Sequence, residues 1–141
     1  MIALDTNVLV RFLVKDDEQQ AELVRVLFME AEQRKEPLLV PLLVVLELIW
    51  VLESVYEISR SKIVGAIEDL IHMTVLQFER VSVVQRFVRS ARDGRGDLAD
   101  LFIAGSAMES GCQSILTFDK KASRLPMFQL LKREGATKQD G

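Results

Sequence analysis

The chain opens with MIALDTNVLV (residues 1–10), in which an apolar run ends abruptly at three polar residues. Residues 2–4 have the continuous hydrophobicity of a short strand that is buried on both faces. Asp5, Thr6 and Asn7 follow at once. One interpretation is that they only turn the chain. The other is that Asp5 binds a ligand at the carboxyl end of a central strand, and the rest of the sequence must decide between the two.

Segments typical of strands and of helices alternate along the chain. Short apolar runs bounded by turn residues predict strands, and apolar residues at helical spacing predict helices. The predicted strands span residues 2–4, 37–41, 74–79, 114–118 and 127–131. The predicted helices span residues 7–14, 18–35, 42–57, 59–73, 81–92 and 97–110. This alternation predicts an α/β fold with a parallel sheet of four to five strands and helices on both faces.

Length and charge limit the possible functions. A chain of 141 residues is long enough for one domain with a substantial core. Its 18 basic and 21 acidic residues give a net charge of −3, so the chain lacks the overall basic character of a general nucleic-acid-binding protein. We expect one folded domain over residues 1–132 and a polar tail over residues 133–141.

Cysteine usage and hydropathy predict a cytoplasmic protein. Cys112 is the single cysteine, and the N-terminus does not resemble a signal peptide. The longest apolar stretch, residues 37–52, is interrupted by Pro41 and Glu47 and is too short for a convincing membrane span. We expect it to form a buried strand and a buried helix, with no membrane insertion.

Glu47 is the most informative residue of the chain. Its neighbours along the predicted helix are apolar, and no basic residue lies within 10 positions of it. A carboxylate in such surroundings must be paired, protonated or bound to a cation to offset the cost of desolvation. A buried ion pair with a distant residue is the structural interpretation, and we favour the functional one. Glu53, on another side of the same helix, is expected to be an ordinary surface residue.

Three more acids stand at the ends of predicted elements. Asp97 and Asp100 open a helix, where carboxylates are favoured as caps and by the helix dipole. Asp119 follows the strand at residues 114–118, as Asp5 follows the first strand. Because the carboxyl ends of parallel strands meet at one edge of a sheet, we expect these acids to converge there with Glu47.

Several carboxylates in one pocket repel each other, so some would be protonated near neutral pH unless a cation were bound. Oxygen ligands without imidazole or thiolate suit Mg²⁺ or Mn²⁺ rather than zinc. His72 and Cys112 lie in separate elements, and no plausible set of residues for nucleophilic catalysis accompanies them. Such a pocket supports metal-activated water attacking a phosphodiester.

Three segments, in this order, carry a resemblance to a known family. They are LDTNVLVRFL (residues 4–13), LELIWVL (residues 46–52) and DLADLFIAGSAMESGCQSILTFDKK (residues 97–121). The chain from Met1 to about Leu131 resembles the PIN domain, and within it the VapC-type toxins of bacterial toxin–antitoxin pairs. The resemblance implies a PIN-like three-layer sandwich. LDTN alone is a weak motif, and the combination of segments is specific.

The resemblance also implies an activity and a set of site residues. Members of the family are Mg²⁺- or Mn²⁺-dependent ribonucleases with four acids, so the chain is expected to be an endoribonuclease toxin of a type II pair. The catalytic and metal-binding acids would be Asp5, Glu47, Asp100 and Asp119. Asp100 is preferred to Asp97 because it directly precedes the apolar LFIA segment, as in the family. The polar residues that would orient the acids or a metal-bound water are Thr6, Asn7, Asp97 and Thr117.

The implied partners are an RNA substrate, a cognate antitoxin that inserts a segment into the site, and a second copy of the chain in a homodimer. Positive charge around an acidic pocket is what a polyanionic substrate needs. The basic residues that flank the acidic elements are Arg11, Lys15, Arg92, Arg95, Lys120 and Lys121, and we expect RNA contacts among them.

Two other functions of a similar architecture fit the sequence poorly. A receiver domain needs a phosphoacceptor Asp after a central strand and a Lys after the last strand, and neither LQFER (residues 76–80) nor MFQLLKRE (residues 127–134) supplies a convincing Asp. A phosphatase that used Asp5 as its nucleophile would need a second Asp where Asn7 stands. A catalytically inactive PIN-like interaction module is compatible with the spacing and stays open.

Overall fold

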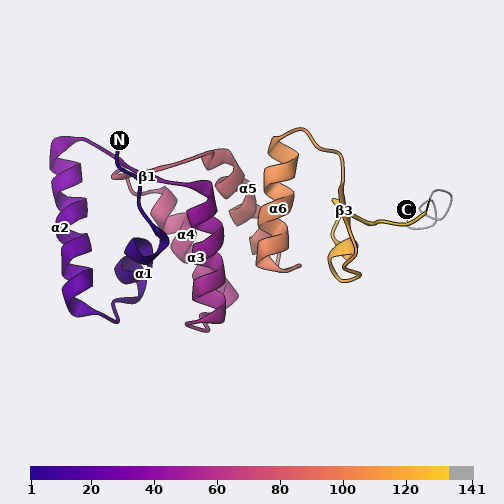
Figure 1. Ribbon diagram of the computed structural model, residues 1–141, viewed down its shortest axis with the longest axis horizontal. Coiled ribbons are helices and arrows are strands. Elements are labelled where there is room, and N and C mark those ends of the chain that lie inside the picture. Colours follow the sequence, from indigo (N-terminus) through magenta and orange to yellow (C-terminus); the bar gives the residue numbers. More distant parts are fainter. Residues whose placement is uncertain (134–141) are drawn as a thin grey trace.

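A computed structural model of the chain describes residues 1–133 (Figure 1). Its helices are α1 (Thr6–Val14), α2 (Glu18–Arg34), α3 (Leu42–Ser54), α4 (Arg60–Ile71), α5 (Val81–Arg92), α6 (Leu98–Glu109) and the 3-10 helix η1 (Ala122–Arg124). Its strands are β1 (Leu38–Val40), β2 (Leu76–Phe78), β3 (Ile115–Thr117) and β4 (Phe128–Leu130). The polar tail predicted at residues 133–141 lies, from residue 134 onward, outside the described residues.

The predicted α/β class is confirmed, and every strand pair is parallel. β1 pairs with β2 in the register Leu38 to Leu76, and β3 pairs with β4 in the register Ile115 to Phe128. The predicted first strand is reduced to a bridge between Ala3 and Leu39. The helices begin and end within a few residues of their predicted bounds, whereas each named strand is only three residues long.

The continuity of the sheet differs from the prediction. We expected one parallel sheet of four to five strands, but the described residues form two separate pairs, β1–β2 and β3–β4. The bridge at Ala3 extends the first pair, and no strand within residues 1–133 joins the two pairs. The prediction of a single sheet is therefore wrong for the chain in this conformation.

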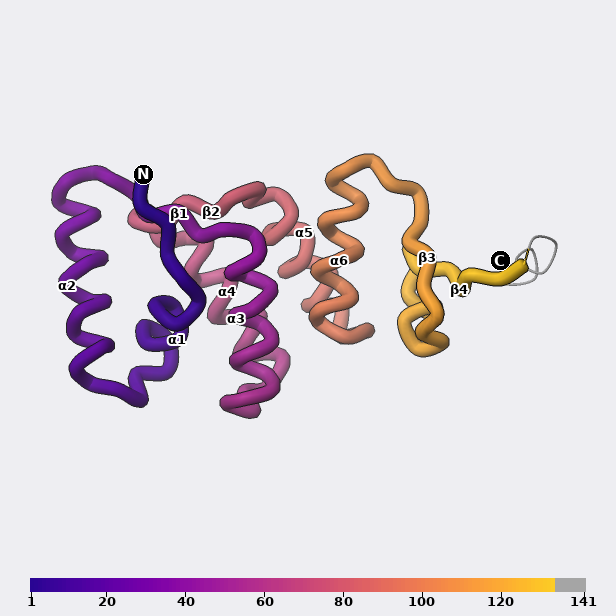
Figure 2. The backbone as a smooth tube through the Cα atoms, in the orientation of Figure 1, coloured from indigo at the N-terminus to yellow at the C-terminus, as the bar shows by residue number. Residues whose placement is uncertain are grey.

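The end of α6 explains why the sheet is divided. The backbone N–H groups of Ser110, Gly111 and Cys112 all donate to carbonyl groups in the last turn of α6, with Cys112 bonding to Ala107 at 3.0 Å. Gly111 has φ of 84°, a left-handed conformation that glycine adopts without steric cost. Only residues 113–114 remain before β3, which lies on the side of α6 away from β1 and β2 (Figure 2).

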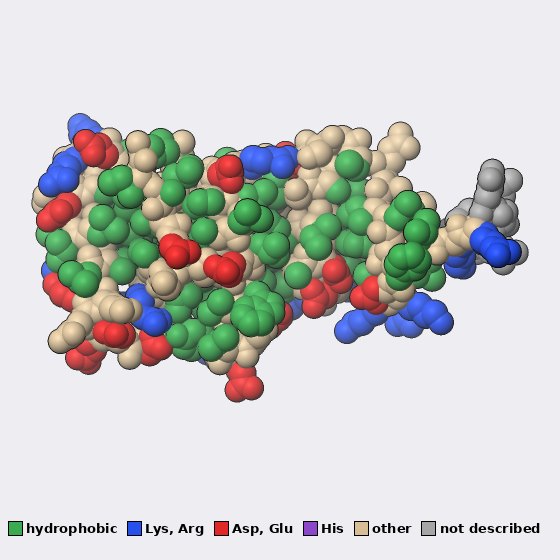
Figure 3. Space-filling view, viewed as in Figure 1, with side chains coloured by type: hydrophobic (Ala, Val, Ile, Leu, Met, Phe, Trp, Pro, Cys, Tyr) green, Lys and Arg blue, Asp and Glu red, His purple; other side chains and the backbone are tan. Residues whose placement is uncertain are grey.

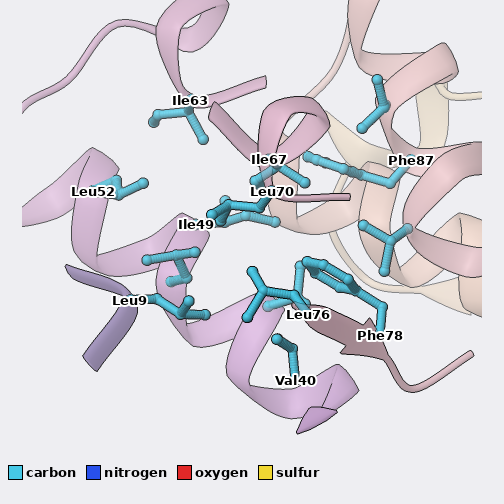
Figure 4. Close-up of a cluster of buried hydrophobic side chains, with 14 of the residues drawn as sticks. Leu9, Val40, Ile49, Leu52, Ile63, Ile67, Leu70, Leu76, Phe78 and Phe87 are labelled. Carbon is cyan, nitrogen blue, oxygen red and sulfur yellow. The ribbon is translucent and has the colours of Figure 1, made fainter. Parts of the chain in front are cut away.

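The hydrophobic core is built mainly from α1, α3, α4, α5 and the β1–β2 pair (Figure 4). Alternate residues of β1 and β2 are buried, and the apolar stripes of the helices close over them. Full burial of each large apolar side chain stabilises a fold by about 1.5–3 kcal/mol. The largest fully buried side chains of this core include Phe87, Leu9, Leu48, Ile49, Leu52, Ile63, Ile67 and Leu70. This core fixes Thr6 and α3 relative to each other, and so positions the first part of the candidate site.

None of the helices in residues 1–133 combines the length and hydrophobicity that crossing a membrane requires.

Gly105 provides a test of the contact between α5 and α6. A Cβ atom at this position would lie 3.5 Å from the carbonyl oxygen of Val83, which is ordinary van der Waals contact. We expect Gly105→Ala to fold with unchanged or slightly higher stability, because alanine favours a helix. Gly105→Leu should lower the free energy of unfolding by about 1–3 kcal/mol, because its longer side chain must displace α5. Urea unfolding of the two variants measures the difference, and equal stability would show that the helices do not approach so closely.

Candidate active site

The first acidic group is formed by Asp5 and Glu47, which Thr6 connects. Asp5 follows the strand-like residues 2–4 and caps α1, because its carboxylate accepts a hydrogen bond from the Thr6 N–H at 2.7 Å. The Thr6 hydroxyl donates to the Glu47 carboxylate. Thr6 is buried, so this bond holds the side chain of Glu47 against the end of the first strand. Both interpretations of the opening triplet are therefore compatible: Asp5 caps a helix and also lies beside a second acid.

A hollow of about 250 Å³ lies at this first group. Asp5, Thr6, Asn7, Arg11 and Glu47 contribute its polar lining. Arg11 is held at the rim, where it donates to Gln20 at 2.6 Å and to Asp16 at 3.1 Å. A larger hollow of about 370 Å³, between the N-terminus and the end of α2, has none of the predicted site acids in its lining.

Glu47 lies in different surroundings from those expected. The sequence placed it among apolar neighbours of a helix buried nearly all round, but Glu47 is exposed. Leu43 and Trp50, which share its side of α3, are 79% and 59% exposed. The inference that a desolvated Glu47 must bind a cation is therefore wrong for a single chain, because water reaches the carboxylate. The same observation reveals an uncovered apolar face on α3.

The second acidic group lies at the start of α6. Asp97 is the N-cap of that helix and accepts hydrogen bonds from the N–H groups of Ala99 at 2.9 Å and Asp100 at 3.3 Å. Partial burial raises the pKa of the Asp100 carboxyl, and the negative charges of Asp97 and Asp119 raise this pKa further. Lys121 opposes the shift. The three acids are thus close enough for their charges to interact, which is the behaviour expected of carboxylates that share a site.

Asp119 is positioned by the turn between β3 and η1. Its N–H donates to the Thr117 hydroxyl at 3.0 Å, and its carboxylate accepts from the N–H groups of Lys121 at 2.8 Å and Ala122 at 3.3 Å. These bonds fix the turn, as the structural interpretation of Asp119 requires. They also hold its carboxylate at a defined place beside α6.

Arg60 is a residue that the sequence did not single out. Its guanidinium, at the start of α4, donates to the carbonyl oxygens of Ala91 at 3.2 Å, Arg95 at 3.1 Å and Gly96. Ala91 lies in the last turn of α5, and Arg95 and Gly96 belong to the loop that leads directly into Asp97 and α6. Arg60 therefore positions the second acidic group, but a single arginine at the start of a predicted helix gives no sequence signal for such a role.

The structure brings the four predicted acids together only in part. Within residues 1–133, no three side chains of the Asp, Glu, His and Cys types lie close enough to bind one metal ion. Asp5 and Glu47 form one group, and Asp100 and Asp119 belong to the other. The donors are all carboxylate oxygens, which suit a hard divalent cation such as Mg²⁺ or Mn²⁺. A complete metal site requires the two groups to meet.

The basic residues predicted to contact RNA are divided in a similar way. Arg11 lines the hollow at the first group, whereas Lys15 is the exposed C-cap at the opposite end of α1 from Asp5. Lys120 and Lys121 lie next to Asp119. Arg92 forms an ion pair with Glu68 on α4. Arg95 lies in the loop before α6 and is exposed. The positions of these residues do not show whether they bind RNA, so the RNA contacts stay a prediction.

The fold and the site residues define a class of protein. Parallel strands alternate with helices, and carboxylates follow the strand-like residues 2–4, follow β3 and begin α6. The sequence model of the PIN domain family matches residues 2–126, so the chain belongs to the PIN domain family. It is similar to a VapC ribonuclease of Aquifex aeolicus (strain VF5), with 26% identity over 125 residues that cover 89% of this chain and 92% of the relative.

The capping role of Asp97 can be tested separately from catalysis. Asp97→Ala removes the acceptor for two N–H groups of α6 and should lower the free energy of unfolding by about 1 kcal/mol. Asp97→Asn keeps a side-chain oxygen at the same place and should be close to the wild type in stability. Both variants remove the charge beside Asp100, so thermal or urea unfolding isolates the effect of the cap. Equal loss in both would assign the effect to charge instead.

Proposed function

We propose that this protein is a metal-dependent endoribonuclease and the toxin of a type II toxin–antitoxin pair. The observation that carries the proposal is that Asp5, Glu47, Asp100 and Asp119 all lie within the residues that match the PIN family and fall into two groups of carboxylates. The similar protein of Aquifex aeolicus is a VapC ribonuclease, which supports the same activity.

The four acids would hold Mg²⁺ or Mn²⁺ through carboxylate oxygens. When bound, such an ion supplies an activated water and stabilises the negative charge that develops on the phosphate. The remaining side chains position these ligands. Thr6 orients Glu47 through its hydroxyl, and the cap at Asp97 holds the first turn of α6, which carries Asp100. Thr117 accepts a hydrogen bond from the backbone of Asp119.

A polymeric substrate needs positive charge beside this acidic site. Lys120 and Lys121 are exposed next to Asp119, and Arg11 lies at the rim of the hollow beside Asp5. These residues would bind RNA phosphates on either side of the acids. Which RNA is cleaved depends on its shape and single-stranded presentation. We place the protein in the cytoplasm, where RNA and an antitoxin would both be accessible.

RNA cleavage should require Mg²⁺ or Mn²⁺ and stop when EDTA removes the metal. Asp5→Asn, Glu47→Gln, Asp100→Asn and Asp119→Asn should each lower the cleavage rate by roughly 100-fold or more, because each removes a charged metal ligand. For Asp5, Glu47 and Asp119 the amide retains an oxygen acceptor for the backbone or hydroxyl donor, so the fold is preserved. Cleavage of a labelled single-stranded RNA measures the rate.

Glu53→Gln is the matched control. Glu53 lies on α3 with Glu47 and is exposed, so removing its charge should leave the cleavage rate unchanged. Cleavage that persists in the four site variants would rule out the proposed site, since a contaminating ribonuclease or another site would then be responsible.

A second candidate is a catalytically inactive PIN-like interaction module. The separation of the two acidic groups within residues 1–133 favours it, because neither group alone holds three metal ligands. Such a module would bind its partner and cleave no RNA at any Mg²⁺ or Mn²⁺ concentration. The cleavage assay therefore separates the two candidates.

Expression in a bacterial host tests the biological role. A ribonuclease toxin should arrest growth when the chain is expressed alone, and co-expression of the small protein from the adjacent gene should restore growth. The Asp5→Asn chain, expressed to the same level, should not arrest growth, because it lacks one of the metal ligands. Arrest by that variant would mean that toxicity arises from something other than catalysis.

A further inference from the structure

The strand-like residues 2–4 leave one edge without a partner strand. The carbonyl group of Ile2 accepts from the Leu39 N–H at 2.8 Å, and the Leu4 N–H donates to the Leu39 carbonyl at 2.9 Å. In a parallel pair the residue between two such positions directs its own N–H and C=O to the opposite edge. That residue is Ala3, which is exposed, and within residues 1–133 no further strand pairs with it.

β3 leaves an edge of the same kind. Its residues Ile115 and Thr117 bond toward β4, through Ile115 N–H to Met127 at 2.8 Å and Leu131 N–H to Thr117 at 2.8 Å. Leu116 therefore directs its backbone groups away from β4, and no other strand of the described chain lies there. An exposed edge of this kind is a template for pairing with another strand.

Large apolar side chains surround both open edges. Ile2 is 63% exposed at the first edge, and Leu43 and Trp50 are exposed beside Glu47. Leu116 of β3 and Phe118, which directly follows the strand, are 59% and 80% exposed. Figure 3 shows hydrophobic side chains at the surface of both ends of the molecule. Large apolar side chains that gather at the surface in this way are typical of an interaction site.

The open edges at Ala3 and at β3 cannot meet within one chain as long as the hydrogen bonds at the C-terminal end of α6 are intact. Hydrogen bonds from Ser110, Gly111 and Cys112 to the last turn of α6 fix the direction in which the chain leaves the helix. Residues 113–114 are too few to carry β3 back around α6 to Ala3, since two extended residues span only about 7 Å. Figures 1 and 2 place β3 and β4 beyond α6, away from the N-terminal strand.

We propose that the β3 edge of one chain pairs with the Ala3 edge of a second copy, so that each complete acidic site is shared between two chains. One chain supplies Asp5 and Glu47, with Asp100 on the α6 that packs against its own α3 and α5, and the other chain supplies Asp119 from beyond the end of α6. The exchange of a matching element between identical chains is a low-cost route to a closed dimer. It leaves the backbone of each chain as described and joins β2, β1, residues 2–4, β3 and β4 into one parallel sheet.

The shared site rests on the proposed ribonuclease function only in the experiment that measures RNA cleavage. Two inactive chains whose substitutions lie in different acidic groups should restore each other, because a mixed dimer contains one site made entirely of unaltered residues. Asp5→Asn and Asp119→Asn chains are co-expressed with different affinity tags, and mixed dimers are purified through both tags. One intact site of two should give about half the wild-type RNA cleavage per dimer.

The matched control combines Asp5→Asn with Glu47→Gln. Both substitutions lie in the same acidic group, so every site of a mixed dimer would contain one of them and no activity should return. RNA cleavage that returns in the Asp5→Asn and Asp119→Asn pair, and not in the control pair, supports the shared site. If the wild type cleaves RNA and the first pair stays inactive, the shared site is wrong and the proposed function stands.

The oligomeric state provides a readout that does not depend on activity. Light scattering should give the wild type twice the chain mass of 16.0 kDa. Phe118→Lys places a charge on a side chain that is exposed in the single chain, so it should leave each chain folded and yield monomers. Leu23→Lys, at a similarly exposed apolar residue of α2, should leave the dimer intact. A monomeric wild type, or a Phe118→Lys variant that stays dimeric, would overturn the proposal.

Discussion

The hydrogen bonds at the end of α6 are the constraint on which the arrangement of this chain depends. Backbone N–H groups after the helix donate to the carbonyl groups of its last turn, and these bonds fix the backbone at Gly111 and Cys112. They therefore determine on which side of the helix β3 begins. Everything downstream follows that path, including the turn that carries Asp119. A local helix cap therefore decides whether the acidic residues of one chain meet.

Electrostatic repulsion between the carboxylates opposes their coming together in one site. Carboxylates brought into one pocket repel each other, and the raised pKa of Asp100 records this repulsion together with partial burial. In the described conformation Glu47 stays in water and is held by one hydroxyl, so its charge is solvated. A divalent cation would offset the repulsion when the two groups meet. Cation binding and closure of the site would therefore favour each other in the proposed enzyme.

Periodicity in the sequence predicted the helices because each helix must bury an apolar side. The spacing of those apolar residues is the same wherever the helix packs. The acids at Asp5, Asp97 and Asp119 could be placed at element ends for the same local reason, and Asp97 is the N-cap that its position suggested. The division of the sheet and the exposure of Glu47 could not be predicted. The division of the sheet depends on where β3 packs, and residues 113–114 carry no pattern that specifies one side of α6. The exposure of Glu47 depends on what packs on α3, which the apolar composition of that helix does not reveal. Arg60 was missed because its partners are backbone carbonyls, which no sequence displays.

A site shared between two chains would link activity to concentration. Each chain in this conformation exposes Leu116 and Phe118, and association would remove both from water together with the apolar face of α3. Burial of apolar surface would drive the association, whereas the carboxylates would oppose it until a cation was bound. A single chain would then lack a complete set of ligands, because its Asp119 lies on the wrong side of its own α6 to reach Glu47. The same open edge at Ala3 that allows a second copy to bind also makes the lone chain vulnerable, since any extended segment that reached it first would occupy the place of β3.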